Sequence, residues 1–277
     1  MRVLAVVQAR MSSSRLPGKV LRDLGGAPVL DWVLRAAETA TGVDGTVVAT
    51  STDPSDDVLV DHARQRGVEV VRGPHQDVLG RFLLAVQAHP CDAVIRLTAD
   101  CPLLDPALIS LVAAAWRSDP GWEYVATTLH RSLPRGLDVE LVRRDVLEQL
   151  DVDAHAHHRL HVTSLLYTHP QGRRLLGLSV SPDAADLRVT LDTAEDLDLL
   201  TELVRRTGNR VVGWGELVAL LRADPALVAR NAGVGSAQQV HQPAVNGFCP
   251  TPGRRSVPGT HSGRSPLHRR PRSVTGR

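Results

Sequence analysis

The first two-thirds of the chain alternates short β-branched runs with longer amphipathic stretches, and this alternation restricts the fold more than any other feature. Four apolar runs are expected as strands, at 3–8, 46–51, 68–71 and 93–98. The stretches between them place apolar residues three and four positions apart, as helices packed on a sheet require. These expected helices span 29–40, 56–65 and 78–89. Repeated strand–helix–strand units predict an α/β, Rossmann-like fold with a mostly parallel sheet covered by helices on both faces.

The pattern changes from about residue 122. Runs at 124–127 and 139–142 look like strands flanking a Leu-Pro-Arg-Gly turn, which indicates a hairpin-like insertion or a mixed extension of the sheet. Further elements are expected as a helix over 155–169, a strand over 187–191, a helix over 194–206 and one or two helices within 216–230. We therefore expect one domain over residues 1–237, with residues 122–170 as a small mixed β/α insertion for substrate binding or dimerisation.

Charge divides the chain into two parts. Residues 238–277 contain seven arginines and no acidic residue, are rich in Pro, Gly and Ser, and show no hydrophobic period, so we expect this segment to be disordered. The whole chain carries +2, which leaves residues 1–237 at about −5. A body of that sign lacks the cationic face that a general nucleic-acid binder needs, and we expect no nucleic-acid partner.

Composition also sets expectations for location and for cysteine chemistry. The sequence contains no apolar run of membrane-spanning length and no signal-peptide pattern at its start, so a cytoplasmic protein without membrane contact is expected. The three cysteines are widely spaced and form no CxxC pair. Free thiols are therefore expected in place of a disulfide framework or a structural zinc site.

The loop after the first expected strand carries an unusual concentration of phosphate-binding groups. Residues 8–19 hold three cations, three serines and a Pro-Gly turn. Small residues at the carboxyl end of a parallel strand let backbone N–H groups approach anionic oxygens, while Arg and Lys neutralise the charge that grows on a leaving pyrophosphate. The loop is neither a Walker A motif nor a GxGxxG fingerprint. It predicts a polyphosphate cradle.

Two aspartates follow expected strands. Asp100 comes directly after the strand at 93–98, and Asp192 lies between the strand at 187–191 and the next helix. Carboxylates at strand ends point into the crevice where open α/β sheets bind ligands, and one or two carboxylates are the usual protein ligands of Mg²⁺. Thr193 with Asp196 predicts a capped helix start, and Asp105 predicts another. We expect Asp100 and Asp192 to share Mg²⁺.

The motif QARMSSSRLPGK resembles the opening of the cytidylyltransferase family that makes CMP-activated sugar acids, and is closest to the branch named for spore coat polysaccharide biosynthesis protein F. LDTAEDL, GPHQDVLGR and RGLDVE resemble further motifs of that family. RLHVT resembles the family's REHVT, with Leu160 in place of the acidic residue. The resemblance implies a GT-A-like nucleotidyltransferase that moves CMP from CTP to a sugar or sugar acid, releases pyrophosphate, uses Mg²⁺ and serves polysaccharide or glycoconjugate biosynthesis.

Residue roles follow from these motifs. Expected catalytic residues are Arg10, Lys19 and Asp100, and expected metal ligands are Asp100 and Asp192. Expected nucleotide-binding residues are Ala9, Arg10, Ser13, Ser14, Arg15, Lys19, Thr50, Arg81 and Thr98. Expected substrate-binding residues are Arg135, Asp138, Glu140 and His161.

Several alternatives stay open at this point. Asp138 and Glu140 fit a homodimer interface as well as a sugar contact, and a turn-forming role for Thr50 is as compatible as nucleotide binding. Surface positions explain His155, His157 and His158 better than zinc ligation does, whereas His161 fits a sugar contact or a role in shaping the dimer. Two other functions compete with this one. The protein could be a glycosyltransferase that uses a nucleotide-sugar, or a nucleotide-binding protein without catalytic activity. Asp100-Cys101-Pro102 lacks the second aspartate of a DxD motif, which disfavours the glycosyltransferase.

Overall fold

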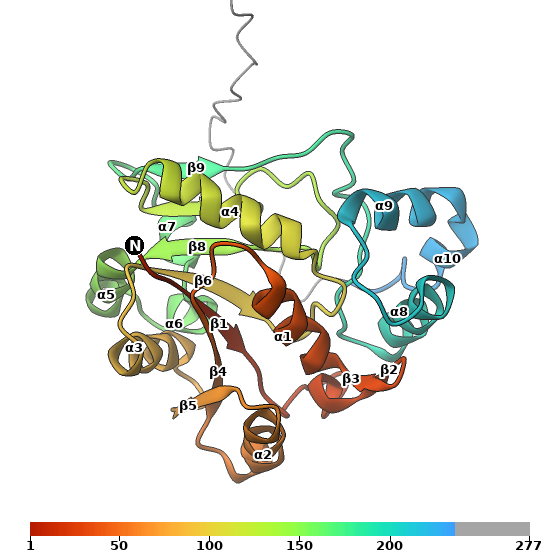
Figure 1. Ribbon diagram of the computed structural model, residues 1–277, viewed down its shortest axis with the longest axis horizontal. Helices are drawn as coiled ribbons and strands as arrows, with labels where there is room; N and C mark the ends of the chain where they lie inside the picture. The colour runs from red at the N-terminus through yellow and green to blue at the C-terminus, as the bar shows by residue number, and fades with distance from the viewer. Residues whose placement is uncertain (236–277) are drawn as a thin grey trace, which may run out of the picture. The chain divides into compact units, whose positions relative to one another are not determined.

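A seven-stranded sheet forms the centre of the computed structural model, which describes residues 1–235. The strand order is β5-β4-β1-β6-β8-β7-β9 (Figure 1). The first four strands in this order are parallel and span Glu69–Gly73, Gly45–Ser51, Val3–Gln8 and Ala93–Thr98. The other three are β8 (Glu140–Arg143), β7 (Tyr124–Ala126) and β9 (Leu175–Gly177). Because β8 runs antiparallel to β6, the expected mixed extension of the sheet is confirmed.

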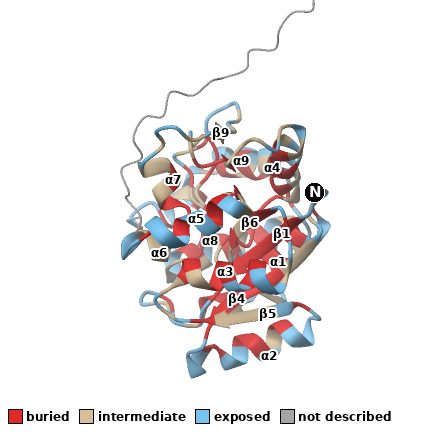
Figure 2. Cartoon of the chain, turned by 90° about the vertical axis from the view of Figure 1, so that its left-hand side faces the viewer, coloured by how far each residue is buried: buried red, intermediate tan, exposed pale blue. Residues whose placement is uncertain are grey.

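Helices cover both faces of this sheet. Val3, Ala5 and Val7 of β1 pack with α1 (Val29–Thr39), α2 (Asp57–Gln65) and α4 (Pro106–Ser118). Leu4 and Val6 point to the other face and pack with α3 (Val78–Ala88) and α5 (Arg144–Asp153). Strands β1, β4 and β6 are mostly buried, β5 is of intermediate exposure, and the outer surface of α2 is exposed (Figure 2). Two layers of helices around a mostly parallel sheet confirm the expected α/β, Rossmann-like fold.

The later helices complete the layer that contains α1. Helices α8 (Ala194–Thr207) and α9 (Trp214–Ala223) contribute buried leucines to the same core as α1, and α10 (Pro225–Ala229) follows them. The two predicted caps are confirmed: Thr193 and Asp196 form a capping box, and Asp105 accepts from Ala107 N. Asp77 caps α3 in the same way, accepting from Gly80 N. The remaining short elements are η1 (Lys19–Leu21), β2 (Asp23–Leu24), β3 (Ala27–Pro28) and η2 (Pro54–Asp56).

Two predicted elements are wrong. The helix expected over 155–169 is two short helices, α6 (His157–His161) and α7 (Ser164–Thr168), separated where Val162 takes a φ of 50°. A β-branched residue at positive φ interrupts a right-handed helix. The strand expected over 187–191 joins no ladder and makes only an isolated bridge between Arg188 and Arg135.

Among residues 1–235, no helix is long and apolar enough to cross a membrane. The segment 238–277, for which disorder was predicted, lies outside the described residues.

Candidate active site

Backbone contacts bring the two strand-end aspartates together. The Leu191 N–H donates to the Asp100 carbonyl at 2.8 Å, and the Thr190 hydroxyl donates to the same oxygen at 3.2 Å. The turn at Gly136 packs against this segment so closely that a Cβ there would lie 2.6 Å from Thr190 N, and Gly136 also has a φ of +106°. Only glycine fits such an approach. Asp100, at the carboxyl end of β6, therefore lies beside Asp192, at the entry to α8.

Lys19 joins the two carboxylates. Its ammonium donates to Asp100 Oδ2 at 2.6 Å, to the Leu191 carbonyl at 2.7 Å and to Asp192 Oδ1 at 2.8 Å. Gly18 precedes it with a φ of +70° and donates from its N–H to the Met11 carbonyl, which closes the loop and aims Lys19 inward. Burial would lower the pKa of Lys19, but the two carboxylates outweigh it and raise the pKa above its ordinary value.

Arginines hold the other oxygen of Asp192. Arg188 donates to Asp192 Oδ2 at 2.7 Å, and Arg15 lies 3.1 Å from the same oxygen. Burial opposes ionisation of Asp192, yet Lys19, Arg188 and Arg15 lower its pKa to about 2. The fully buried Asp196 fixes Arg188 in turn, through bonds of 3.0 Å to both its Nε and its terminal nitrogen. Asp192 is thus a carboxylate of fixed orientation that stays charged at neutral pH.

The two aspartates meet the basic requirement for a shared divalent cation. A single positively charged atom, Lys19 Nζ, already touches an oxygen of each, so it serves as a stand-in for such an ion. Side chains of Asp100 and Asp192 are 27% and 22% exposed, which leaves them open to a ligand. Within the described part of the chain, no three His, Cys, Asp or Glu side chains group to hold a metal. Phosphate oxygens and water would have to complete the coordination, as is usual for Mg²⁺.

The loop between β1 and η1 places Arg10 near a second arginine, Arg81. Arg10 is exposed and lies near Arg81, whose side chain is almost fully buried on α3. Arg81 Nε has no hydrogen-bond partner, and burial together with Arg10 lowers the pKa of Arg81. A buried donor without a partner is rare in folded proteins. These two guanidinium groups can therefore accommodate an anion beside the loop.

A buried carboxylate, Asp56, anchors the start of this loop through hydrogen bonds. Asp56 is fully buried and accepts from the Met11 N–H at 2.7 Å, from the Ser51 N–H at 3.2 Å and from the Ser51 hydroxyl. Ser13 accepts from the Leu16 N–H at 3.4 Å, and Ser14 is exposed. The loop is tied down at both ends while its exposed centre stays available to a ligand.

The other residues expected to bind the nucleotide differ from one another in burial. Ala9 is buried and continues the sheet through a bond from its N–H to the Ala49 carbonyl at 3.1 Å. Thr98 is half-buried near the carboxyl edge, with its hydroxyl 3.1 Å from Cys101 Sγ. Thr50 is fully buried, and its hydroxyl has no partner. The structure therefore does not bring the Thr50 side chain to the surface of the cleft.

Arg135 lies near both Asp138 and Asp192. Arg131 pairs with Asp138 through bonds of 2.6 and 3.1 Å. Arg135 is half-buried, and burial followed by the charges of Arg131 and Arg188 lowers its pKa. This region adds positive charge next to Asp192, where an acceptor with an anionic group could be held.

Glu140 occupies a different setting from the one expected. It is buried, and its two oxygens accept from Arg96, from the Tyr124 hydroxyl and from the Thr163 hydroxyl. These contacts favour a structural role over the substrate contact expected from the sequence. His161 lies near Arg96 and Glu140, and burial lowers its pKa to about 4.

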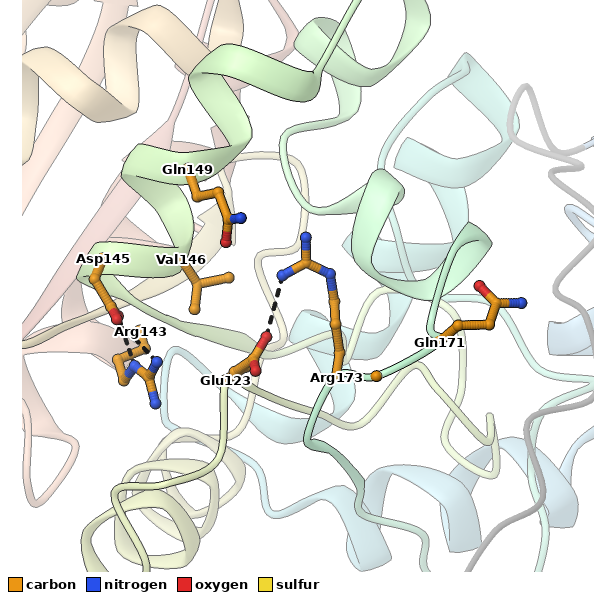
Figure 3. A pocket seen from close by; sticks show the side chains of 8 residues that line it. Glu123, Arg143, Asp145, Val146, Gln149, Gln171 and Arg173 are labelled. Carbon is orange, nitrogen blue, oxygen red and sulfur yellow. Dashed lines mark hydrogen bonds and ion pairs between the residues drawn. The ribbon is translucent and has the colours of Figure 1, made fainter.

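A cavity of about 310 Å³ lies away from the two aspartates (Figure 3). Glu123 and Arg143 line it, and Arg143 pairs with Ala93 at the amino end of β6. Asp100 follows the opposite end of that strand. The Glu123–Arg173 and Arg143–Asp145 ion pairs across it are already formed, so this cavity is not the catalytic cleft.

Sequence reasoning missed three contributors to the site. Arg188 and Asp56 were not singled out, and Asp196 was assigned only a capping role. The i, i+4 spacing of Arg188 and Asp192 is the one local signal for the first of them. The roles of Asp56 and Asp196 depend on contacts between turns that are distant in the sequence, so no local pattern predicts them.

Known proteins resemble this chain in sequence and in fold. The family model described as Cytidylyltransferase matches residues 4–210. The spore coat polysaccharide biosynthesis protein SpsF of Bacillus subtilis is 34% identical over 233 residues, which cover 80% of this chain and 95% of SpsF. A cytidylyltransferase structure from Leptospira borgpetersenii matches with a TM-score of 0.79 and 27% identity, covering 82% of this chain and 97% of that one.

A CMP:2-keto-3-deoxy-manno-octonic acid synthetase complexed with CTP shares the fold, with a TM-score of 0.58 and 18% identity over 75% of this chain and all of that one. The family match covers most of the chain, including the loop at 8–19, Asp100 and Asp192. The protein therefore belongs to the cytidylyltransferase family.

Proposed function

We propose that the protein transfers CMP from CTP to a sugar or sugar acid, releases pyrophosphate, and holds Mg²⁺ on Asp100 and Asp192. The observation that carries this proposal is the contact of one cationic atom with both carboxylates, at the end of a loop that also carries the exposed Arg10. Bound Mg²⁺ would stabilise negative charge on the α-phosphate during transfer. Family membership and the CTP complex of the related synthetase support the choice of nucleotide.

Each group of side chains takes one part of the reaction. Arg10, Arg81 and Lys19 bind the phosphates of CTP, with Ser13, Ser14 and Arg15 beside them. The acceptor hydroxyl oxygen forms a bond to the α-phosphorus while the bond from that phosphorus to the β-phosphate oxygen breaks, so pyrophosphate leaves. Arg188 keeps Asp192 oriented throughout. The protein's contribution is thus positioning and charge stabilisation.

Arg135 and Asp138 are the groups that we propose for the acceptor, because Arg135 lies close to Asp192 and Asp138 lies close to Arg135. A carboxylate on the acceptor would pair with Arg135, whose guanidinium forms no ion pair with an acidic side chain within residues 1–235. His161, which lies near Arg96 and Glu140, is a further proposed contact for the acceptor. A sugar acid fits this arrangement better than a neutral sugar.

The test is a screen of the four nucleoside triphosphates against a panel of sugars and sugar acids, with and without Mg²⁺. Pyrophosphate release is expected with CTP, a sugar acid and Mg²⁺ together. Asp100→Asn is the matched control, since it removes one charge without changing shape. Equal release with all four triphosphates would contradict the CTP assignment, and consumption of a nucleotide-sugar would favour a glycosyltransferase instead.

A further inference from the structure

Lys19 is the one lysine among the 32 lysine and arginine residues of the sequence. An arginine presents five donors in a planar fork, whereas a lysine ammonium is a compact point charge with three donors. The chain carries arginine at every other cationic position, including those around the cleft. The place that Lys19 occupies therefore matches a small, nearly spherical cation.

The surroundings of the ammonium fit this description. Its three donors meet three oxygen acceptors, namely Asp100 Oδ2 at 2.6 Å, the Leu191 carbonyl at 2.7 Å and Asp192 Oδ1 at 2.8 Å. Two carboxylates and a carbonyl are also the kind of oxygen ligands that hard divalent cations take. The ammonium and a metal ion would need the same carboxylate oxygens, so the two cannot occupy the site together.

We propose that Lys19 is an exchangeable occupant of the metal position, and that divalent metal binds there only when a nucleotide triphosphate draws the ammonium away. This inference rests on the proposed function, because it takes Asp100 and Asp192 as the metal ligands. Phosphate oxygens offer the ammonium charge-assisted bonds in exchange for those it gives up. Metal and nucleotide then bind cooperatively, and the free protein is protected from binding metal alone.

The carboxylates stay in place when the ammonium leaves. Arg188 keeps Asp192 Oδ2 at 2.7 Å, and the buried Asp196 fixes Arg188. Leu191 and Thr190 hold the backbone of Asp100. The exchange releases Asp192 Oδ1, Asp100 Oδ2 and the Leu191 carbonyl oxygen, so three oxygen ligands are already in position for a metal.

A rival account is that any nearby cation weakens metal binding through its charge. Arg15 separates the two accounts, because it lies 3.1 Å from Asp192 Oδ2 but has no bond to Asp100. Removing Arg15 takes away one positive charge without opening the position between the carboxylates. Lys19→Met and Arg15→Met therefore change the charge equally and differ in which of them vacates the metal position.

Binding of Mn²⁺ to the full chain, followed by electron paramagnetic resonance without nucleotide, tests the proposal. Lys19→Met is expected to bind Mn²⁺ about ten-fold or more tightly than the wild type, and Arg15→Met within about three-fold of it. Circular dichroism melting checks that both variants are folded. Equal affinities of wild type and Lys19→Met, or equal gains in both variants, would overturn the proposal.

Wild-type protein provides a second measurement that needs no substitution. A single lysine gives one side-chain signal in a ¹⁵N-lysine-labelled sample. Mg²⁺ alone at millimolar concentration is expected to leave this signal unchanged, while Mg²⁺ with a non-hydrolysable CTP analogue shifts it. A shift with Mg²⁺ alone would show that metal displaces Lys19 without nucleotide, and the inference would then be wrong.

A separate variant distinguishes failure of the inference from failure of the proposed function. Asp100→Asn should lose most Mn²⁺ binding in the presence of the CTP analogue. If it binds Mn²⁺ as the wild type does, the assignment of the metal ligands is wrong, whatever Lys19→Met shows. If only Lys19→Met behaves as the wild type, the metal ligands stand and the exchange is rejected.

Discussion

Two cation–carboxylate clusters lie near strand β6, and they differ in how many of their polar atoms form hydrogen bonds within the protein. The open cluster consists of Lys19, Asp100 and Asp192, and its two aspartate side chains are 27% and 22% exposed. The closed cluster consists of Arg96, Glu140, Tyr124 and Thr163, and the side chains of its ion pair are 10% and 9% exposed. Both contain a buried cation paired with carboxylate, so charge and residue type alone do not separate them.

The two clusters differ in whether their polar atoms remain available to bind a ligand. Both oxygens of Glu140 are bonded inside the protein, and Arg96, Thr163 and Tyr124 lower the pKa of Glu140 in spite of its burial. The closed cluster thereby ties β6, β7 and β8 to Thr163, which precedes α7. The aspartates of the open cluster are partly exposed, and its cation is the one proposed to exchange. A saturated buried ion pair indicates structure, whereas a partly exposed one beside unpaired cations indicates a site.

The largest expected effect is on activity at the open cluster. Asp100→Asn should lower kcat/KM for CTP-dependent pyrophosphate release by about 10³-fold, because it removes one of two charges that would hold the metal. The free energy of unfolding should change by no more than about 1 kcal/mol, since Asp100 is partly exposed. Activity assays and urea denaturation on one preparation measure both quantities. Activity within ten-fold of the wild type would place catalysis elsewhere.

Glu140→Gln should produce the opposite result. It leaves Arg96 buried without a compensating charge, and we expect a loss of about 3–5 kcal/mol in the free energy of unfolding. At a temperature where the variant is still folded, its kcat should stay within about three-fold of the wild type. If stability is unchanged and activity is lost, Glu140 contacts substrate after all and the comparison between the clusters fails.

Replacing lysine by arginine in the open cluster, and arginine by lysine in the closed cluster, should affect activity in the first case and stability in the second. Lys19→Arg keeps the charge but replaces three converging donors with a planar fork, and should lower kcat/KM about 100-fold. Arg96→Lys loses the 3.1 Å bond to Gln8 and should cost about 1–2 kcal/mol of stability with little effect on activity. Kinetics and denaturation of the two variants side by side measure this. Similar outcomes for both exchanges would mean that geometry matters equally in the two clusters.

The sequence predicts the parts of the molecule that depend on local patterns. Strands β1, β4 and β6 follow from their apolar runs, and the positions of Asp100 and Asp192 at turns follow from the residues around them. Partners that depend on the meeting of distant turns do not follow. Arg188 and Asp196 act on Asp192 because residues 187–191 run beside Asp100 and Arg135 instead of pairing in a ladder.

The burial of Glu140 is another feature that the local sequence does not predict. Strand periodicity suggests that Asp138 and Glu140 share a face, but it does not reveal that Tyr124 and Thr163 close over the second of them. The break between α6 and α7 depends on the backbone of Val162, for which the local sequence gives no signal. Burial of a polar side chain is decided by long-range packing, and a motif does not encode it.

The smallest expected effect concerns His161, at the border of the closed cluster. Its pKa is about 4 in the folded protein, against an ordinary value of 6.5, so the unfolded chain binds this proton more tightly. Stability should therefore fall as the pH drops from about 6.5 to 4, by about 1 kcal/mol from this residue once solvent screening is allowed for. His161→Gln should flatten that part of the profile, measured by urea denaturation across this pH range. Because the open cluster holds no histidine, Asp100→Asn is the matched control and should keep the wild-type slope between pH 6.5 and 5; an unchanged slope in His161→Gln would place the titrating group elsewhere.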